Sequence, residues 1–172
     1  MEHKQLLTVF NSLPVGIGFF TADGTLVRCN ESFCRIFGAD SQTLLGNKLN
    51  INENSVVPDV VKEAVRRCVP VQMSFLYDFD KQRTDKRFFS TRTRTCYLKC
   101  NGNPLYDNDG KFVNYIFIFE DITETVKSEE VLRQSRRKTE LAMKAANIMF
   151  WEFDAVAKLF YSDNEPLNGY DQ

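Results

Sequence analysis

The feature that most constrains the fold is a junction of turn, strand and helix start close to residue 120. Residues 108–110 (Asn-Asp-Gly) are expected to supply the positive backbone angles of a tight turn, and residues 111–120 form an aromatic and β-branched run that predicts a strand. This strand must end at Asp121-Ile122-Thr123. There, Asp121 or Thr123 can accept hydrogen bonds from the free amides of a charged helix, as an N-cap does.

Three other stretches predict the rest of a sheet. A strand opens in residues 13–20, turns at Asp23-Gly24 and returns through residues 25–30. After Pro70 the apolar period becomes two, and Val71, Met73, Phe75, Tyr77 and Phe79 predict a half-buried strand. A polar hairpin loop over residues 81–86 and a second long strand over residues 88–102 follow. The pattern predicts an α+β fold with five antiparallel strands and short helices on one face.

The remaining ordered stretches have the period of helices. Residues 2–12 carry Leu6, Leu7, Val9 and Phe10 at helical spacing and predict a short helix packed on the sheet. Short helices are expected between residues 31 and 46, broken at Gly38 and Gly46. Another helix begins after Pro58 and runs through residues 59–68.

The junction Asp121-Ile122-Thr123-Glu124 resembles the end of a PAS domain, a sensor module common in bacterial signalling proteins. Asn30 also leads into Phe33, Phe37 and Gly38 in a run similar to the family's Asn-x-x-Phe-x-x-x-Phe-Gly. The matching pieces occur in the family's order. The resemblance implies a PAS domain over residues 13–122, with residues 1–12 as an N-terminal cap helix.

Residues 123–147 predict a charged signalling or linker helix without Pro or Gly. One seam has the alternating spacing of a coiled coil and is weak, because it contains one large apolar residue: Thr125, Ser128, Leu132, Ser135, Thr139, Ala142 and Ala146. One interpretation is a solvated connector. The other is a marginal parallel dimer seam, which the resemblance to PAS-linked helices favours.

Residues 148–172 resemble the start of a second, truncated PAS domain. Ala145-Ala146-Asn147 precedes an expected strand that contains Trp151, and residues 159–162 would form its second strand. A lone hairpin cannot bury enough surface to be stable alone. We therefore expect the chain to belong to a longer multi-domain protein.

Composition argues against several partners. A net charge of −1 gives no electrostatic reason to expect nucleic acid, and 43% hydrophobic content suffices for a core. Acidic residues Asp78, Asp80 and Asp85 are interspersed with the clustered basic residues, which predicts a solvated edge: Arg83, Lys86, Arg87, Arg92 and Arg94. No window is apolar enough for direct membrane insertion, so a cytoplasmic location is expected, with a membrane-anchored parent still possible. The odd number of cysteines, 5, favours free thiols.

The sequence lacks the residues of familiar cofactor and catalytic sites. Haem needs an axial ligand, and the single histidine is His3 at the N-terminus. A flavin photoreceptor of this family would carry a reactive cysteine where Gly46-Asn-Lys-Leu-Asn-Ile stands; Cys34 lies on the earlier helix and is expected to be a buried core residue. Cys96 and Cys100 are too far apart along one strand for a disulfide, and no metal site is expected. Neither a phosphate loop nor a nucleophile paired with a usable histidine is present, so no enzyme is predicted.

The candidate ligand pocket follows from the strand phases. With Lys99 toward solvent, Cys96, Leu98 and Cys100 face the helices, and the resemblance places the aromatics of the last strand on the same side. The predicted pocket residues are Phe37, Phe75, Tyr77, Leu98, Cys100, Tyr115, Phe117 and Phe119. They either fill a core that binds no ligand or accommodate a small apolar or aromatic ligand between the Phe rings and the Tyr hydroxyls.

Two functions remain open. The first is a sensor or input module of a multi-domain bacterial signalling protein, a sensor histidine kinase, which passes a ligand- or partner-induced change through Asp121, Ile122 and Thr123 to an output domain. The second is a ligand-free dimerisation scaffold in a kinase, cyclase or transcription regulator. Either is expected to be a homodimer, with a dimer face formed by Leu6, Phe10, Ile116 and Ile118.

Overall fold

The computed structural model describes residues 2–82, 90–146, 151–154, 156, 159–162 and 165–166 of the 172-residue chain. It divides into two compact units, Met1–Val126 and Lys127–Gln172. The first unit contains the sheet and the short helices. The second contains most of a long helix and three short strands.

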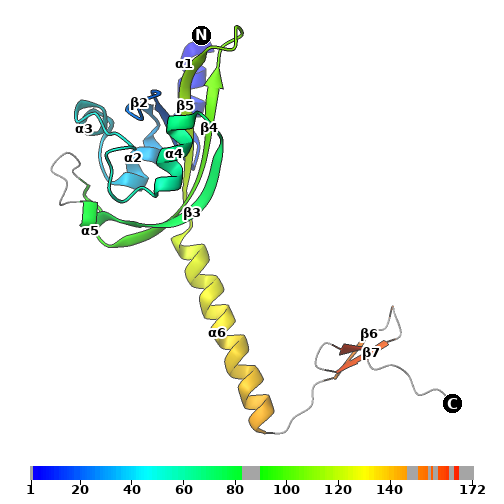
Figure 1. Cartoon of the computed structure of the whole chain (residues 1–172). Helices are drawn as coiled ribbons and strands as arrows, with labels where there is room; N and C mark the ends of the chain where they lie inside the picture. The colour runs from blue at the N-terminus through cyan, green and yellow to red at the C-terminus, as the bar shows by residue number, and fades with distance from the viewer. Residues whose placement is uncertain are drawn as a thin grey trace. The chain divides into compact units, whose positions relative to one another are not determined.

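A five-stranded antiparallel sheet forms the first unit, in the order β2-β1-β5-β4-β3 (Figure 1). The first and last strands in sequence order of the domain, β1 and β5, are neighbours, and β5 is the central strand. This confirms the predicted α+β fold. The strands are β1 (Gly16–Phe20), β2 (Leu26–Cys29), β3 (Val71–Asp78), β4 (Thr95–Tyr106) and β5 (Phe112–Asp121).

The helices between β2 and β3 lie on the concave face of the curved sheet (Figure 1). Their ends follow local capping chemistry: Asn30 accepts from the Phe33 amide at the start of α2, and Gly38 ends that helix with a φ of 64°. Among the described residues the helices are α1 (Glu2–Ser12), α2 (Glu31–Phe37), α3 (Ser41–Gly46), α4 (Asp59–Arg67), α5 (Phe79–Gln82) and α6 (Thr123–Ala145).

The end of β3 differs from the sequence prediction. Phe79 does not continue the strand but begins α5, because the carboxylate of Asp78 accepts a hydrogen bond from the Lys81 amide at 2.9 Å and so caps a helical turn. The predicted loop over residues 81–86 therefore begins as helix. Residues 83–89, which include Arg83, Asp85, Lys86 and Arg87, lie outside the described residues.

The strand predicted over residues 88–102 in fact runs from Thr95 to Tyr106. Residues 90–94 form neither helix nor strand, and Arg94 has a φ of 72°, which breaks the extended chain. At its far end β4 continues past the last β3 pair, Val71 with Gly102, and is then paired with β5 alone. A strand with one free side tolerates a proline, which explains Pro104.

The β4–β5 hairpin closes through a turn at residues 107–110. The Asp107 carboxylate accepts from the amides of Asp109 at 3.0 Å and Lys111 at 2.9 Å. Gly110 has a φ of 76°, whereas Asn108 and Asp109 are not among the residues with positive φ. The turn was placed correctly, but the expectation of positive angles at Asn108 and Asp109 was wrong, because Asp107 organises the turn through its side chain.

The alternation along β4 and β5 sorts side chains to the two faces of the sheet as predicted. The aromatic residues Tyr115, Phe117 and Phe119 are buried on the helical side, together with Cys96, Leu98 and Cys100. On the other side, Ile116 and Ile118 are half-buried and Glu120 is exposed. Gly102 permits this packing, since a Cβ there would overlap the Phe117 ring and lie 2.7 Å from Cε1 of Tyr115.

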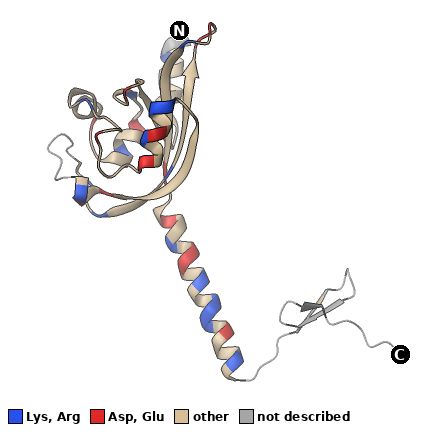
Figure 2. Ribbon diagram, viewed as in Figure 1, with Lys and Arg blue, Asp and Glu red and all other residues tan. Residues whose placement is uncertain are grey.

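The second unit begins within α6. No residue of α6 is buried, and Leu132 of the predicted seam is 53% exposed. Basic and acidic side chains are interspersed along it (Figure 2), and Arg133 contacts Glu130 through two hydrogen bonds of 2.8 Å. Within the described residues no helix is both long and apolar enough to cross a membrane.

Three short antiparallel strands follow, in the order β6-β7-β8: β6 (Trp151–Asp154), β7 (Leu159–Ser162) and β8 (Glu165–Pro166). β6 contains Trp151, and β7 has the predicted bounds. Asn147, which precedes the expected first strand, lies outside the described residues. The assignment of this segment to a second PAS domain stays a prediction.

Candidate functional site

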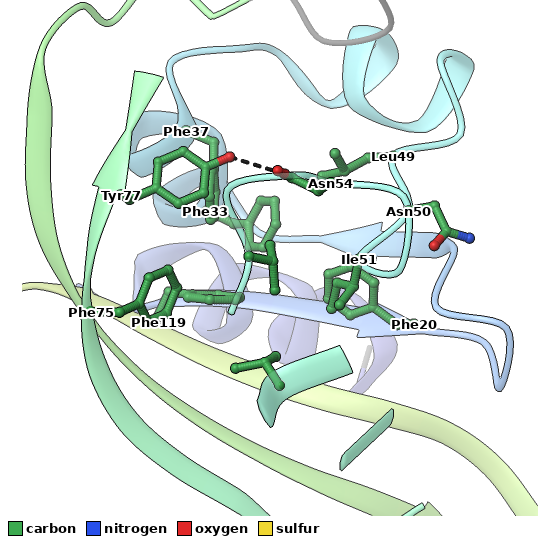
Figure 3. A pocket seen from close by; sticks show the side chains of 12 residues that line it. Phe20, Phe33, Phe37, Leu49, Asn50, Ile51, Asn54, Phe75, Tyr77 and Phe119 are labelled. Carbon is green, nitrogen blue, oxygen red and sulfur yellow. Dashed lines mark hydrogen bonds between the residues drawn. The ribbon is translucent and has the colours of Figure 1, made fainter. Parts of the chain in front are cut away.

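The candidate site is a small apolar cavity between the concave face of the sheet and the helices. Its volume is about 20 Å³, which is room for about one water molecule. Aromatic rings from the sheet and from α2 converge on it (Figure 3). The lining comprises Phe20, Phe33, Phe37, Leu49, Asn50, Ile51, Asn54, Val57, Val61, Phe75, Tyr77 and Phe119.

Four of the predicted pocket residues line this cavity: Phe37, Phe75, Tyr77 and Phe119. The other four, Leu98, Cys100, Tyr115 and Phe117, are fully buried in the same core but lie outside the lining. The hydroxyl of Tyr115 is engaged elsewhere, because it donates to the Val69 carbonyl at 2.5 Å. Its pKa is raised to about 12, chiefly by burial.

Several lining residues were not predicted. Phe33 belongs to the PAS-like run but is not among the predicted pocket residues, and residues 49–57 have no apolar period that would place them over a cavity. This segment follows α3 and is held by a hydrogen bond from the Leu26 amide to the Leu49 carbonyl at 2.8 Å. It contains three asparagines, Asn50, Asn52 and Asn54, and Asn54 is only 8% exposed.

Two polar residues of the cavity lining, Tyr77 and Asn54, form a buried hydrogen-bonded triad with Gln82, which lies outside the lining. The Tyr77 hydroxyl donates to Oε1 of Gln82 and accepts from Nδ2 of Asn54 at 3.2 Å (Figure 3 marks the contact with Asn54). Burial raises the pKa of Tyr77, so the phenol remains neutral. Because these three groups satisfy one another, a ligand that displaced none of them would be held by apolar contacts.

Phe37 is the centre of the aromatic packing. Its ring centroid lies 4.5 Å from that of Phe33, 5.5 Å from Tyr77 and 5.3 Å from Phe119, the last two in edge-on geometry. It is also the last residue of α2. A displacement of the end of α2 would therefore change the shape of the cavity.

The end of α2 is tied to the segment that precedes β4. The Ser90 hydroxyl donates to the Phe37 carbonyl at 2.7 Å, and the Thr91 amide donates to the Gly38 carbonyl at 2.7 Å. Nη1 of Arg92 donates to the Ile36 carbonyl at 3.0 Å. These bonds satisfy carbonyls that the end of a helix leaves without partners.

Arg92 also reaches the start of α6. Its Nη2 lies 2.9 Å from Oδ2 of Asp121, and its guanidinium stacks 5.2 Å from the centre of the Phe79 ring. The sequence predicts Arg92 on a solvated edge with the other basic residues. Its three contacts place it between α2, α5 and the last residue of β5, so for Arg92 that interpretation was wrong.

The predicted junction is a compact hydrogen-bonded unit. Oδ1 of Asp121 accepts from the Thr123 amide at 3.1 Å and the Thr123 hydroxyl at 2.6 Å. Thr123 does not cap the helix; its Oγ1 accepts from the Tyr97 amide of β4 at 2.9 Å, and the Ile122 amide donates to the Tyr97 carbonyl. Burial alone would raise the pKa of Asp121, but the Thr123 hydrogen bonds and Arg92 together lower it.

The cysteines divide into two groups. Cys96 and Cys100 are buried, and burial raises the pKa of each to about 11. Cys34 was expected to be buried but is half-buried, with its sulfur 3.8 Å from that of Cys29. Among the described residues no group of three or more His, Cys, Asp or Glu side chains could hold a metal ion.

The predicted dimer residues differ in exposure. Leu6 is 67% exposed, whereas Phe10 is half-buried with its ring 6.1 Å from that of Phe19. Phe19 pairs with Ile116 in the sheet, so both side chains are on the face opposite the cavity. Phe10 thus packs on that face within one chain, and Leu6 remains available for an intermolecular contact.

Comparison with known proteins assigns the first unit to a family. The family described as PAS fold matches residues 10–127. A probable diguanylate cyclase, DgcE, from Escherichia coli is 20% identical over 157 residues, which cover 91% of this chain and 14% of the cyclase. The chain therefore spans about a seventh of that relative.

Solved structures share the fold. An RNA-binding light-oxygen-voltage receptor superimposes with a TM-score of 0.59 at 18% identity, over 81% of this chain and 38% of the receptor. A PAS domain from a two-component sensor histidine kinase gives a TM-score of 0.52 at 14% identity, over 70% of this chain and 96% of that domain.

Proposed function

From the premise that this chain belongs to the PAS family, we propose that its sensor domain is the input module of a multi-domain bacterial signalling protein. A change at the cavity passes to an output domain through α6. The stimulus is a small apolar or aromatic ligand, or a partner that acts on the same wall. The residues described here have no catalytic role in this proposal.

The observation that carries the proposal is the position of Arg92. Its guanidinium binds the Ile36 carbonyl at the end of α2 and the carboxylate of Asp121, the last residue of β5, two residues before α6 begins. Phe37, which follows Ile36, lines the cavity. A ligand that displaced the Phe37 ring would shift the end of α2 and strain one of these two contacts.

The cavity must expand before a ligand can enter it. Haem or flavin needs several hundred Å³, so neither fits a cavity of about 20 Å³. A single small aromatic ring needs less, and the Phe37 and Phe75 side chains are the ones whose rotation would open space. Phe75 is only partly buried, which leaves it room to rotate outward.

For the output we propose a sensor histidine kinase of a two-component system acting as a cytoplasmic homodimer, with α6 as a parallel coiled-coil linker. Structural similarity to a histidine kinase PAS domain supports this assignment at the level of the fold. A diguanylate cyclase output is the second candidate, supported by the similarity to DgcE.

A ligand-free dimerisation scaffold is the alternative function. It is favoured by the same small volume, since Phe33, Phe37 and Phe119 fill the space that a ligand would occupy. The two functions predict different effects of a small aromatic probe on the amide protection of the junction at Asp121.

The experiment uses indole as the probe and hydrogen exchange as the readout. In the full chain, indole should change the amide protection of residues 36–39 and of residues 122–126 together. In Arg92→Gln, the change at residues 36–39 should persist while that at residues 122–126 is lost. Arg94→Gln is the matched control, since this arginine lies on the same segment and makes none of the three Arg92 contacts.

An equal response at the junction in Arg92→Gln would show that Arg92 does not transmit the change. No response to indole anywhere in the domain, together with no small molecule in native mass spectra of the purified protein, would favour the scaffold.

A further inference from the structure

Two cysteines lie together at the corner between β2 and α2. Cys29 is the last residue of β2 and Cys34 lies in α2, and their sulfur atoms are 3.8 Å apart. A disulfide has an S–S length of about 2.05 Å, so side-chain rotation that closes the remaining gap would join them. In the described chain both thiols are free.

This pair is accessible to a small reagent, unlike the buried Cys96 and Cys100. Both side chains are half-buried and line a surface depression of about 490 Å³, together with Asn11, Glu31 and Asp40. The depression is on the opposite side of α2 from the cavity lined by Phe33 and Phe37, so the two sites share a helix but no lining residue.

We propose that Cys29 and Cys34 form a redox-responsive dithiol that oxidation converts into an intramolecular disulfide. The oxidant is a small disulfide such as glutathione disulfide. The Cys34 thiolate attacks one sulfur of the oxidant and releases one glutathione; the Cys29 thiolate then attacks the Cys34 sulfur and releases the second. The two protein thiols lose two protons and two electrons, and the oxidant takes them up as two glutathione molecules.

The order of attack follows from the environment of each thiol. Burial, and then the neighbouring Cys34, raise the pKa of Cys29 to about 12. Burial also raises the pKa of Cys34, but a hydrogen bond from Cys29 opposes this rise. Cys34 is therefore the thiol that ionises first, and Cys29 resolves the mixed disulfide. Raised pKa values make the reaction slow at neutral pH, because the thiolate is the attacking species.

The disulfide would add a covalent link at the corner between β2 and α2, where hydrogen bonds of Asn30 already position α2 relative to the sheet. Asn30, between the two cysteines along the chain, is 1% exposed and accepts from the amides of Ile17 at 2.8 Å and Phe33 at 2.9 Å. Its Nδ2 donates to the carbonyls of Phe10 and Val15. A covalent link across Asn30 would restrict motion of α2 relative to β2, and α2 carries two rings of the cavity wall.

The sequence provides a direct assay, because Arg28 precedes Cys29 and Arg35 follows Cys34. Trypsin therefore releases residues 29–35 as one peptide containing both thiols. After equilibration of the full chain with glutathione disulfide, this peptide should be lighter by two hydrogen atoms. Cys29→Ser and Cys34→Ser should each carry one glutathione instead, and Cys68→Ser, which removes a half-buried cysteine elsewhere, should behave as the wild type.

Phenylarsine oxide, which binds two nearby thiols, gives an independent readout. It should protect residues 29 and 34 from alkylation in the wild type and in Cys68→Ser, but not in either single variant. Glutathione adducts on both cysteines of the wild-type peptide, or a disulfide that forms only in urea, would overturn the proposal.

Hydrogen exchange tests the structural consequence. In the oxidised protein, the amides of Ile17 and Phe33, which donate to Asn30, should exchange several-fold more slowly than in the reduced protein. Faster exchange would show that the disulfide distorts the corner, and the claim that it fastens α2 to β2 would be wrong.

Discussion

The guanidinium of Arg92 connects two oxygen acceptors that are far apart in sequence: it lies 2.9 Å from the Asp121 carboxylate and 3.0 Å from the Ile36 carbonyl. Asp121 in turn accepts two hydrogen bonds from Thr123, the first residue of α6. The end of one cavity helix and the beginning of the C-terminal helix are thus held by consecutive polar contacts.

Replacement of Asp121 by Ala should affect signalling more than folding. Loss of a helix-capping side chain costs about 0.5 to 2 kcal/mol, which a domain of ordinary stability survives. The amides of residues 122–126 should exchange faster, and the full-length protein should lose or lock its output response while its melting temperature falls by a few degrees. Thr123→Ser, which keeps the acceptor for the Tyr97 amide, is the matched control. Normal regulation in Asp121→Ala would reduce Asp121 to a simple helix cap.

The stability contributed by Asp121 should depend on pH. Burial would raise its pKa, but the Thr123 hydrogen bonds and Arg92 lower it below 3.8, the usual value for an aspartate. A carboxylate with a lowered pKa in the folded state stabilises the fold above its unfolded pKa, and the contribution is lost as the pH falls through the folded pKa. Urea melts should show wild type more stable than Asp121→Asn at pH 7 by about 1 kcal/mol or less, given the partial exposure of the pair. The difference should shrink below pH 3.8; a constant difference would contradict the assignment.

Phe117 and Gly102 should prove to be coupled. Phe117 is fully buried, so Phe117→Ala should destabilise the domain by about 3 to 5 kcal/mol. Gly102→Ala adds a methyl group that overlaps the same ring and should cost about 1 to 3 kcal/mol. Combined with Phe117→Leu, the alanine at position 102 should cost less than in the wild type, as measured by urea melts in a double-mutant cycle. Additive effects would mean that the sheet, not the ring, shifts to admit the methyl group.

The exposed side chain of Leu6 predicts a homodimer that forms through α1. Leu6→Glu should lower the mass measured by light scattering from twice the chain mass toward that of one chain, because a carboxylate opposes apolar contact. Leu6→Met keeps the volume and should leave the dimer intact. A wild-type monomer at high micromolar concentration would exclude this interface.

The predicted seam of α6 can be tested with neighbouring residues. Leu132 belongs to the seam and is 53% exposed, while Val131 lies off it and is 67% exposed. Leu132→Glu should weaken self-association measured by sedimentation, and Val131→Glu should not. Equal effects of the two substitutions would identify α6 as a solvated connector.

The parts of the fold that follow from local pattern could be predicted from the sequence. Alternation along β4, with Lys99 toward solvent, assigned Cys96, Leu98 and Cys100 to the buried face, since side chains of a strand change sides at every residue. The resemblance to PAS domains assigned the aromatic residues of β5 to the same face. The helix break predicted at Gly38 is the end of α2, and Asn30, identified by its place in the PAS-like run, caps the start of that helix. In each case the decisive interaction lies within a few residues of the position that was predicted.

The cavity and its polar connections depend on contacts that no local pattern encodes. The alternation of apolar residues along β3 extends to Phe79 in the sequence. Only the hydrogen bond from the Lys81 amide to the Asp78 carboxylate reveals that a helical turn begins there. Residues 49–57, which contribute several lining residues of the cavity, show no helical or strand period of apolar residues in the sequence. In the sequence, nothing distinguishes Arg92 from the neighbouring arginines. Its partner Ile36 lies 56 positions away and becomes adjacent only after folding.

The long β4–β5 hairpin has a practical consequence for engineering the protein. Its turn, residues 107–110, is exposed, and a side chain added at Gly110 would meet no atom within 4 Å. β4 is paired with β5 alone beyond Gly102, so the last part of the hairpin supports no other strand. A fluorophore or peptide tag inserted after Asn108 would therefore report on the domain from the end of its central strand while leaving the cavity and the Asp121 junction untouched.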